Sequence, residues 1–132
     1  FKAINDAHGH SAGDRVLTAF AEQLSQHVRA QDLLCRFGGE EFVLLMPGAD
    51  LLSAEALAER IRTQWQGQTF SNAQGVLSAT VSIGYVCVSD GAEQGLYRLI
   101  DLADQALYDA KQCGRNCVRC WQPTEVLVAV SN

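Results

Sequence analysis

The stretch from Leu77 to Cys87 places the strongest constraint on the fold, because apolar residues alternate along it with small or polar ones. The odd positions hold Leu77, Ala79, Val81, Ile83, Tyr85 and Cys87, and the even positions hold Ser78, Thr80, Ser82 and Gly84. A repeat of two residues is the period of an extended chain, whose side chains point alternately to opposite faces. The stretch therefore predicts a β-strand, so the fold contains a sheet.

Three other stretches repeat their apolar residues every three or four positions, which is the period of an amphipathic helix. We expect these helices at about 12–28, from Ser53 to about Gly67, and from about Leu96 to Cys113. Their apolar stripes are Val16, Leu17, Phe20, Leu24 and Val28; Leu57, Ile61 and Trp65; and Leu96, Leu99, Ile100, Ala103, Leu107 and Ala110. We expect Ser11 and Asp14 to cap the first helix and Gly114 to end the third in a left-handed conformation.

Two short apolar runs, at 33–37 and 42–46, flank Gly38-Gly39-Glu40-Glu41, and Pro47 closes the second run. This pattern is typical of a β-hairpin. A last short strand is expected from Cys117 to Trp121. The order helix, strand, strand, helix, strand, helix, strand predicts an α+β sandwich, in which helices pack on one sheet.

The length of 132 residues fits a single domain, which we place at 1–122, followed by a tail at 123–132. The tail is apolar enough to pair as an edge strand, or it frays. The first helix begins so early in the chain that we expect a strand beneath it to lie upstream of Phe1.

Acidic residues exceed basic ones by 15 to 10, so the formal net charge is −5. A surface of that sign repels nucleic-acid polymers and anionic membranes, but it does not exclude a single nucleotide that carries its own metal ion. The start of the chain lacks the layout of a signal peptide, and no apolar run reaches the roughly 20 residues that span a bilayer. We therefore expect a cytoplasmic location, either for the whole protein or for this part of a membrane-anchored sensor.

The five cysteines are an odd number, which fits a reducing compartment better than a disulfide framework. Cys113, Cys117 and Cys120 lie close together, as the ligands of a zinc site would. No histidine or fourth thiol flanks them at zinc-finger spacing, so zinc is not favoured.

The segment Gly38-Gly39-Glu40-Glu41-Phe42 allows two interpretations. It is a tight turn with solvated acids, or its glycines let the backbone approach a phosphate while a carboxylate holds Mg²⁺. The second interpretation requires a base reader and basic phosphate ligands elsewhere in the chain.

Five segments, in this order and at this spacing, closely resemble the diguanylate cyclase family, or GGDEF domain. They are Phe1-Lys2-Ala3-Ile4-Asn5-Asp6, Gly9-His10-Ser11-Ala12-Gly13-Asp14, Arg36-Phe37-Gly38-Gly39-Glu40-Glu41-Phe42, Val81-Ser82-Ile83-Gly84 and Ala110-Lys111-Gln112-Cys113-Gly114-Arg115-Asn116. The resemblance covers residues 1 to about 121. It implies a palm-like sandwich with a mostly antiparallel sheet, and condensation of two GTP into cyclic di-GMP with release of two pyrophosphates.

Carried over position by position, the resemblance makes Glu40 a ligand of Mg²⁺ (or Mn²⁺) and makes Asn5 and Asp14 the readers of guanine. It assigns the terminal phosphates of GTP to Lys111 and Arg115, and close approach of the substrate to Gly38 and Gly39. The plainer alternatives are turn and cap formation for Asn5 and Asp14, and compensation of a helix dipole for the basic pair.

The role of Glu41 stays open between a general base for the ribose 3′-hydroxyl and a structural or metal-supporting group. Structural roles are favoured for His8, His10 and His27. Arg29 and Asp32, in an Arg-x-x-Asp pair, resemble the family's inhibitory product site, and Arg60 matches its secondary arginine. The plainer alternative for Arg29 and Asp32 is a surface salt bridge.

The family's first metal ligand is an aspartate upstream of the segment at which this chain begins, so that ligand is absent from the sequence. We expect a catalytic domain that works as a homodimer, each subunit holding one GTP, and that is joined upstream to a sensor or dimerisation module. The rival interpretation is a non-catalytic module that binds GTP or cyclic di-GMP. The intact segment from Gly38 to Phe42 favours the enzyme.

Overall fold

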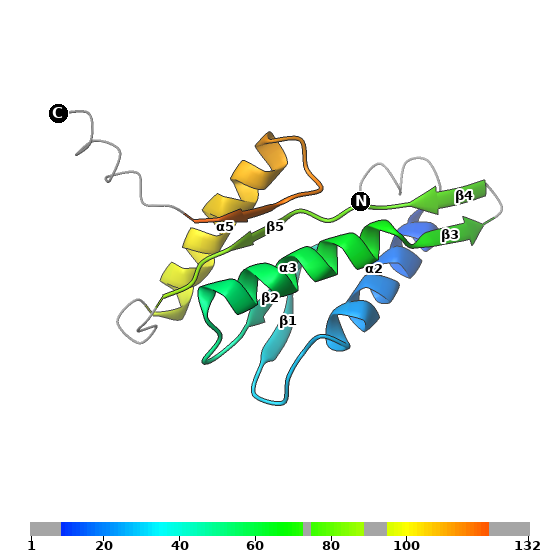
Figure 1. Cartoon of the computed structure of the whole chain (residues 1–132). Helices are drawn as coiled ribbons and strands as arrows, with labels where there is room; N and C mark the ends of the chain where they lie inside the picture. The colour runs from blue at the N-terminus through cyan, green and yellow to red at the C-terminus, as the bar shows by residue number, and fades with distance from the viewer. Residues whose placement is uncertain (1–8, 73–74, 89–94, 122–132) are drawn as a thin grey trace. The chain divides into compact units, whose positions relative to one another are not determined.

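A computed structural model describes residues 9–72, 75–88 and 95–121 (Figure 1). Its elements, in chain order, are α2 (His10–Ser25), β1 (Leu33–Gly38), β2 (Glu41–Leu45), α3 (Leu51–Gln66), β3 (Thr69–Asn72), β4 (Gly75–Ser78), β5 (Ile83–Tyr85), α5 (Leu96–Gln112) and β6 (Val118–Cys120). The chain divides into two compact units, Phe1–Val81 and Ser82–Asn132. The expected tail at 123–132 lies outside the described residues.

The first unit is organised around the buried faces of α2 and α3. Its core contains Ala12, Val16, Trp65 and Leu77, against which Ala19, Phe20, Phe70, Ala79 and Val81 pack. The ring centroids of Phe20 and Trp65 lie 4.9 Å apart in an edge-to-face contact that joins the two helices. The predicted helical stripes are thus confirmed where they matter most, since Trp65 is only 2% exposed.

Both helices of this unit begin earlier than expected, and their caps differ from the prediction. Gly9 caps α2 with φ 88° and no side-chain hydrogen bond, so the prediction of Ser11 and Asp14 as caps is wrong. Both residues lie inside the helix, beyond the position from which a side chain can reach the first N–H groups. Asp50 caps α3 instead, because its carboxylate accepts a 2.7 Å hydrogen bond from the Ser53 N–H. That bond lowers the pKa of the Asp50 carboxyl.

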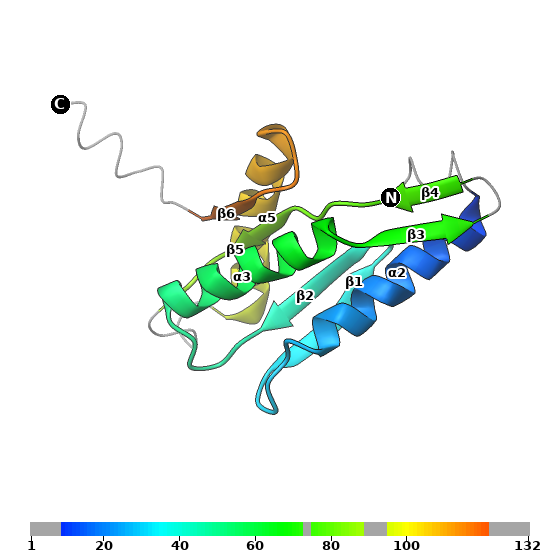
Figure 2. The ribbon, with the colours of Figure 1, turned by 45° about the vertical axis from the view of Figure 1, so that its right-hand side comes forward.

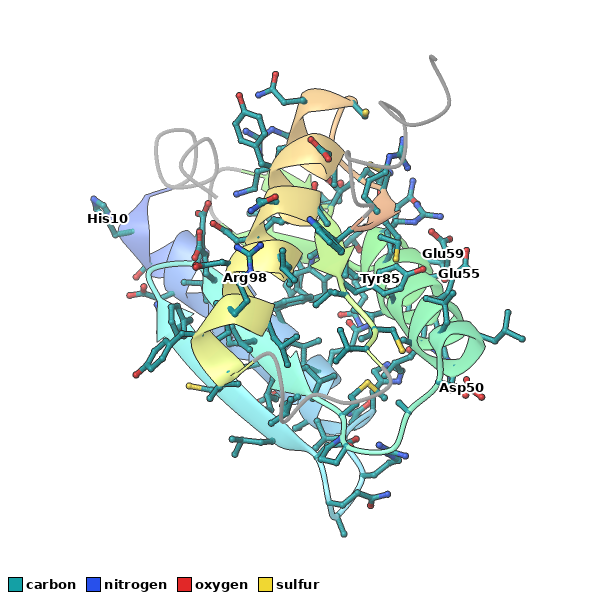
Figure 3. The ribbon with its side chains drawn as sticks, turned by 90° about the vertical axis from the view of Figure 1, so that its left-hand side faces the viewer. His10, Asp50, Glu55, Glu59, Tyr85 and Arg98 are labelled. Carbon is teal, nitrogen blue, oxygen red and sulfur yellow. The ribbon has the colours of Figure 1, made fainter. Side chains whose placement is uncertain are left out.

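Figure 3 shows Asp50 beside the start of α3, with Glu55 and Glu59 further along the same helix. Glu59 accepts two hydrogen bonds from Arg62, at 2.8 and 2.9 Å. The side chains of Glu55 and Glu59 follow each other at a spacing of four residues, as neighbours on one helix face do. Glu55 is exposed on this face, whereas Glu59 is half-buried and paired with Arg62.

The strands of the first unit form two antiparallel hairpins. The predicted hairpin is confirmed, with β1 paired to β2 (Figure 2). A second hairpin, β3 with β4, was not predicted, because Thr69–Asn72 is a short polar segment without an alternating pattern.

The alternating stretch from Leu77 to Cys87 does not form one strand. Leu77 and Ser78 end β4 in the first unit, residues 79–82 are not in a strand, and β5 begins at Ile83 in the second unit. Alternation indicates that a chain is extended, but it does not say which neighbour the chain pairs with. The described strands therefore form three two-stranded ladders instead of the single sheet expected, while the α+β class is confirmed.

The second unit consists of α5 packed on the parallel pair β5 and β6 (Figure 1). Leu102, Ala106 and Ala110 are the buried residues of α5. Gly84 in β5 touches this helix directly, since a Cβ atom there would lie 2.1 Å from the Leu107 backbone nitrogen. The strand can approach the helix backbone this closely only because position 84 carries no side chain.

Among the described residues, none of the helices combines the length and the apolar character that crossing a bilayer requires.

Candidate functional site

The tip of the β1–β2 hairpin is a two-residue turn preceded by a bulge. Arg36 pairs with Phe42 and Gly38 with Glu41, so Phe37 is the extra residue and Gly39-Glu40 forms the turn. A bulge next to a turn redirects the side chains that follow it. The predicted glycine-rich tip is therefore present as a tight, irregular hairpin end.

The two glycines at the tip are needed for their backbone conformation. Gly38 has φ 136° and Gly39 has φ 49°, both in the region that favours glycine. A Cβ atom at either position would meet nothing within 4 Å. The space around the tip is thus open. Positive φ at Gly39, the first residue of the turn, is typical of a type II′ hairpin.

Arg36 fixes this turn from within β1. Its Nε donates a 2.9 Å hydrogen bond to the Gly39 carbonyl, and its Nη2 donates to the same oxygen. No role for Arg36 follows from the sequence alone, because an arginine in a short strand is ordinarily a solvated side chain. In the folded chain, Arg36 holds the glycine turn by donating to a carbonyl three residues along the chain.

Glu40 and Glu41 follow each other at the tip, and both residues are exposed. Carboxylate oxygens are ligands that Mg²⁺ prefers, and Mg²⁺ commonly takes one or two of them together with substrate phosphates. The donor set at the tip fits such an ion. No group of three or more His, Cys, Asp and Glu side chains that could hold a metal occurs in the part of the chain that the structure describes.

Asp14 is exposed in the first half of α2, at the edge of an open hollow of about 390 Å³. The hollow is lined by Asp14, Arg15, Thr18, Ala19, Glu22 and Phe70. Arg15 connects its two sides, because its Nη1 donates a 3.2 Å hydrogen bond to the Ser71 carbonyl of β3. Asn5, the second predicted guanine reader, lies outside the described residues.

Lys111 and Arg115 flank the C-terminus of α5 in the second unit. Lys111 lies in the last turn and is half-buried, whereas Arg115 is exposed beyond the helix. The Arg115 N–H donates a 3.0 Å hydrogen bond to the Ala110 carbonyl, and Gly114 has φ 105°. This is the Schellman arrangement, so the prediction of Gly114 as the left-handed residue after the helix is confirmed.

Arg29 and Asp32 form a bidentate ion pair. Arg29 Nη2 donates to Asp32 Oδ1 at 2.7 Å, and Arg29 Nε donates to Asp32 Oδ2 at 3.1 Å and to Oδ1 at 3.0 Å. Asp32 also accepts a 2.8 Å hydrogen bond from the Arg29 N–H, and Nη2 donates a 2.9 Å bond to the Pro47 carbonyl. These bonds hold the pKa of the Asp32 carboxyl below its usual range and raise the pKa of Arg29.

The burial of this pair is uneven, and that leaves part of Arg29 available. The Asp32 side chain is 0% exposed, whereas the Arg29 side chain is 40% exposed. Among the described residues, the Arg29 hydrogen bonds use Nε and Nη2, so Nη1 keeps its donors. Arg60 is exposed on α3, and no hydrogen bond joins it to Arg29 or Asp32 within the described ranges.

The predicted site residues fall into both units. The hairpin tip, Asp14, the Arg29–Asp32 pair and Arg60 belong to the first unit, and Lys111 and Arg115 belong to the second. Within the first unit, α2, β1, β2 and α3 each contribute part of the predicted set, and Arg29 and Asp32 lie in the connection between α2 and β1. Within the second, one helix end carries both basic residues.

Comparison with known proteins places these features in a family. The family model described as "Diguanylate cyclase, GGDEF domain" matches residues 1–117. The response regulator PleD of Caulobacter vibrioides is 48% identical over 120 residues, which cover 89% of this chain and 26% of PleD. This chain therefore spans about a quarter of the length of that curated relative.

Solved structures give the same result. The GGDEF domain of DgcB from Caulobacter crescentus, in complex with c-di-GMP, matches with a TM-score of 0.86 and 29% identity over 92% of this chain and 70% of that one. The active GGEEF domain of a diguanylate cyclase from Vibrio cholerae matches with a TM-score of 0.79 and 29% identity, over 92% and 76% of the two chains. The chain thus belongs to the diguanylate cyclase family, of which it is a GGDEF domain.

Proposed function

We propose that this chain is the catalytic domain of a diguanylate cyclase, which condenses two GTP molecules into cyclic di-GMP and releases two pyrophosphates. The hairpin tip carries the proposal, because Gly38 and Gly39 adopt positive φ there while Glu40 and Glu41 are exposed. Carboxylate oxygens beside a backbone without side chains suit a nucleotide phosphate accompanied by Mg²⁺. Membership of the family supports the same activity.

At the tip, Glu40 would hold Mg²⁺ (or Mn²⁺) through its carboxylate, and the two glycines would admit a phosphate close to the backbone. A bound metal ion offsets negative charge that builds up on the phosphate oxygens. Asp14, together with Asn5, would hydrogen-bond to the donor and acceptor edge of guanine. Adenine would leave these polar groups unpaired, and that is a strong basis for rejecting it.

Lys111 and Arg115 would bind the terminal phosphates of GTP. Arginine offers a planar fork of donors and lysine a point charge, and both form charge-assisted hydrogen bonds with phosphate oxygens. Lys111 in the last turn of α5 and Arg115 just beyond it are also placed where cations interact favourably with the helix dipole. The same side chains can serve both purposes, because the dipole acts on their charge and the phosphate acts on their donors.

In the reaction, the 3′-hydroxyl oxygen of one GTP attacks the α-phosphorus of the other, and the bond from that phosphorus to pyrophosphate breaks. The hydroxyl proton leaves to a base, for which Glu41 is one candidate; support of the metal or of the tip is the other role open to it. Two such steps close the ring and release two pyrophosphates. One chain offers one guanine reader and one tip, so we propose a homodimer in which two subunits face each other.

We further propose product inhibition through Arg29 and Asp32, with Arg60 as a secondary contact. The Arg29 side chain is 40% exposed, and its Nη1 can donate to a phosphate or guanine oxygen while Asp32 holds the guanidinium in place. The DgcB neighbour was solved in complex with c-di-GMP, which supports a binding site for that ligand on this fold. We propose a cytoplasmic location and an upstream sensor or dimerisation module.

The activity is tested by Glu40→Ala in the full-length protein, with cyclic di-GMP measured by chromatography after incubation with GTP and Mg²⁺. Loss of a metal ligand should lower the rate by about 100-fold or more, because the phosphate is then misplaced. The fold should survive, since Glu40 is exposed at a hairpin tip. Glu55→Ala, an exposed acid on α3, is the matched control and should keep the parent rate.

Turnover near the parent level in Glu40→Ala would remove Glu40 from the metal site. A parent protein that binds GTP or cyclic di-GMP but forms no product would favour the rival proposal, a non-catalytic binding module. The Arg29–Asp32 pair would then be the functional site of such a module, because its geometry does not depend on the hairpin tip.

A further inference from the structure

The turn that follows α5 contains three consecutive residues with positive φ. Gly114 has φ 105°, Arg115 has φ 63° and Asn116 has φ 47°. Positive φ is ordinary for glycine and tolerated by asparagine, but it is unfavourable for arginine. Residues in this conformation persist where the surrounding structure fixes them, and they concentrate at functional sites.

On the helix side, the turn is held by the Schellman hydrogen bond from the Arg115 N–H to the Ala110 carbonyl, 3.0 Å long. On the strand side, the Asn116 N–H donates a 3.2 Å hydrogen bond to Ser82 Oγ. One residue further along each segment, the Ile83 N–H donates a 3.0 Å bond to the Cys117 carbonyl. The turn is therefore fixed between α5 and the start of β5.

Ser82 offers the Asn116 N–H an acceptor at a fixed position, because the strand that follows Ser82 packs closely against α5. Gly84, two residues along and on the same face of the strand, approaches the helix so closely that a Cβ atom would lie 2.1 Å from Leu107 N and 2.4 Å from Ala103 O. Ser82 and Gly84 thus contact the terminal turn and the helix, respectively. A side chain without a hydroxyl at position 82 would not give the Asn116 N–H this acceptor.

The bonds that hold the turn also decide what it can offer to a phosphate. The N–H groups of Arg115 and Asn116 are both used inside the protein, so the charge available to a ligand comes from the Lys111 and Arg115 side chains. Where the Arg115 guanidinium points depends on the φ of Arg115 and Asn116. Displacements of about 1 Å in a residue that positions a substrate can cost about 100-fold in rate.

We propose that Ser82 is a positioning residue for Arg115 of the basic pair Lys111 and Arg115, acting through the backbone of Asn116. The inference rests on the proposed binding of the GTP terminal phosphates by that pair, and it adds a residue that touches neither nucleotide nor metal. Ser82 holds the left-handed turn, and the turn directs Arg115 toward the phosphates.

The test compares Ser82→Ala, Ser82→Thr and the parent in the full-length protein. Calorimetry in Mg²⁺ measures binding of a non-hydrolysable α,β-methylene analogue of GTP, and competition measures binding of GMP, which lacks the terminal phosphates. Ser82→Ala should weaken the triphosphate about fivefold to tenfold and leave GMP within about twofold, because a lost hydrogen bond loosens only the turn. Ser82→Thr keeps the hydroxyl acceptor and should restore most of the affinity.

A second readout does not depend on the nucleotide. Hydrogen exchange of the Asn116 amide should become faster in Ser82→Ala, whereas the Trp121 amide, bonded to the Tyr85 carbonyl at 2.8 Å, should keep its protection. Ser78→Ala, an exposed serine in the same alternating stretch but in the first unit, is the matched control and should change neither readout. In an Arg115→Ala background, Ser82→Ala should have no further effect on triphosphate binding.

Equal triphosphate affinity in the parent and Ser82→Ala, or equal weakening of triphosphate and GMP, would overturn the positioning role while leaving the cyclase proposal intact. An effect of Ser82→Ala that adds in full to that of Arg115→Ala would also overturn it. A parent protein that does not prefer the triphosphate to GMP would overturn the phosphate-binding role of the basic pair, and this inference with it.

Discussion

The tip of the β1–β2 hairpin and the turn after α5 both use left-handed backbone, but they place different residues in it. At the hairpin tip, the positive φ values belong to Gly38 and Gly39, and the acidic side chains follow them. After α5, positive φ extends from Gly114 to Arg115 and Asn116, so a charged residue itself carries the unfavourable conformation. The hairpin thus separates the turn-forming residues from the chemical ones, whereas the helix end combines the two.

The difference has a physical reason in what supports each region. The hairpin tip projects from a two-stranded ladder, and open space surrounds its glycines. The helix-end turn is bonded on both sides, to Ala110 in α5 and to Ser82 before β5. A charged residue with positive φ costs about 1–2 kcal/mol, which a well-bonded turn can offset and a projecting tip cannot.

The largest effect is expected from Gly84→Ala, which disrupts the close contact between β5 and α5 that supports the helix-end turn. The new Cβ would lie within 3 Å of three backbone atoms of α5, and backbone cannot move aside as a flexible side chain does. Overpacking of this kind should cost about 3 kcal/mol or more in the free energy of unfolding. Thermal unfolding measures the loss, and cyclic di-GMP production should fall with it.

Gly67→Ala is the matched control for Gly84→Ala, because its φ is −77° and the nearest atoms to a Cβ would be 3.7 Å away. It should leave the unfolding temperature close to that of the parent. If Gly84→Ala melted like Gly67→Ala, β5 would not be held against α5 as closely as the structure indicates, and it would not support the helix-end turn.

The comparison also separates what the sequence could predict from what it could not. The hairpin, the three helices and the Schellman glycine follow from local patterns, since apolar spacing and glycine placement are properties of neighbouring residues. The division of the alternating stretch between β4 and β5 does not, because strand pairing is decided by residues far apart in the chain. The β3–β4 hairpin does not follow from the sequence for another reason: Thr69–Asn72 is short, mostly polar and without an alternating pattern.

The candidate site shows the same division. Glu40, Lys111, Arg115 and the Arg29–Asp32 pair were chosen by resemblance to family motifs, which carries chemistry but not contacts. The guanidinium of Arg36 on the Gly39 carbonyl, and the hydroxyl of Ser82 on the Asn116 N–H, are visible only in the folded chain. Both residues lie in segments that carry the resemblance, but the sequence does not show what they bind, because a backbone N–H or carbonyl is present at nearly every position.

A second prediction separates the effect of the unfavourable backbone conformation at Arg115 from the effect of its guanidinium charge. Arg115→Gly removes both the unfavourable φ and the guanidinium, so the free energy of unfolding should stay within about 1 kcal/mol of the parent or rise. Binding of the GTP analogue should weaken about tenfold to 100-fold, because a charge-assisted bond to phosphate is lost. Calorimetry and thermal melting of the same samples give both values.

Arg115→Lys keeps a positive charge at the same position and serves as the control. It should bind the analogue more tightly than Arg115→Gly but less tightly than the parent, since lysine lacks the planar fork. Analogue binding that is unchanged in Arg115→Gly would mean that the left-handed arginine serves the turn alone.

A third prediction concerns the hairpin tip, where glycine is needed for conformation. Gly39→Ala should cost about 1–2 kcal/mol of stability, because φ 49° is unfavourable for a residue with a Cβ. It should also lower cyclic di-GMP production, since the turn that presents Glu40 is altered. Gly48→Ala, with φ 77° and equally open space, is the control for strain without chemistry: its stability loss should be similar, and its rate should match the parent.

The smallest effect is expected on acidification, and it should separate the two units. The bonds described for the helix-end turn end on carbonyl and hydroxyl oxygens, whereas the Arg29–Asp32 pair depends on a carboxylate whose pKa is lowered, chiefly by the Arg29 side-chain hydrogen bonds. A carboxyl with a lowered pKa in the folded state adds stability above its unfolded pKa of about 3.9, and that stability is lost as the pH falls through the folded pKa. The stability difference between the parent and Asp32→Asn should therefore be constant from pH 7 to about pH 5 and shrink below about pH 4.

Urea unfolding of the parent, Asp32→Asn, Arg29→Met and the double variant, at pH 7 and pH 3, isolates the coupling between the two side chains. A coupling of equal size at both pH values would show that the carboxylate charge does not hold Arg29, and that the backbone contacts of Arg29 and Pro47 do.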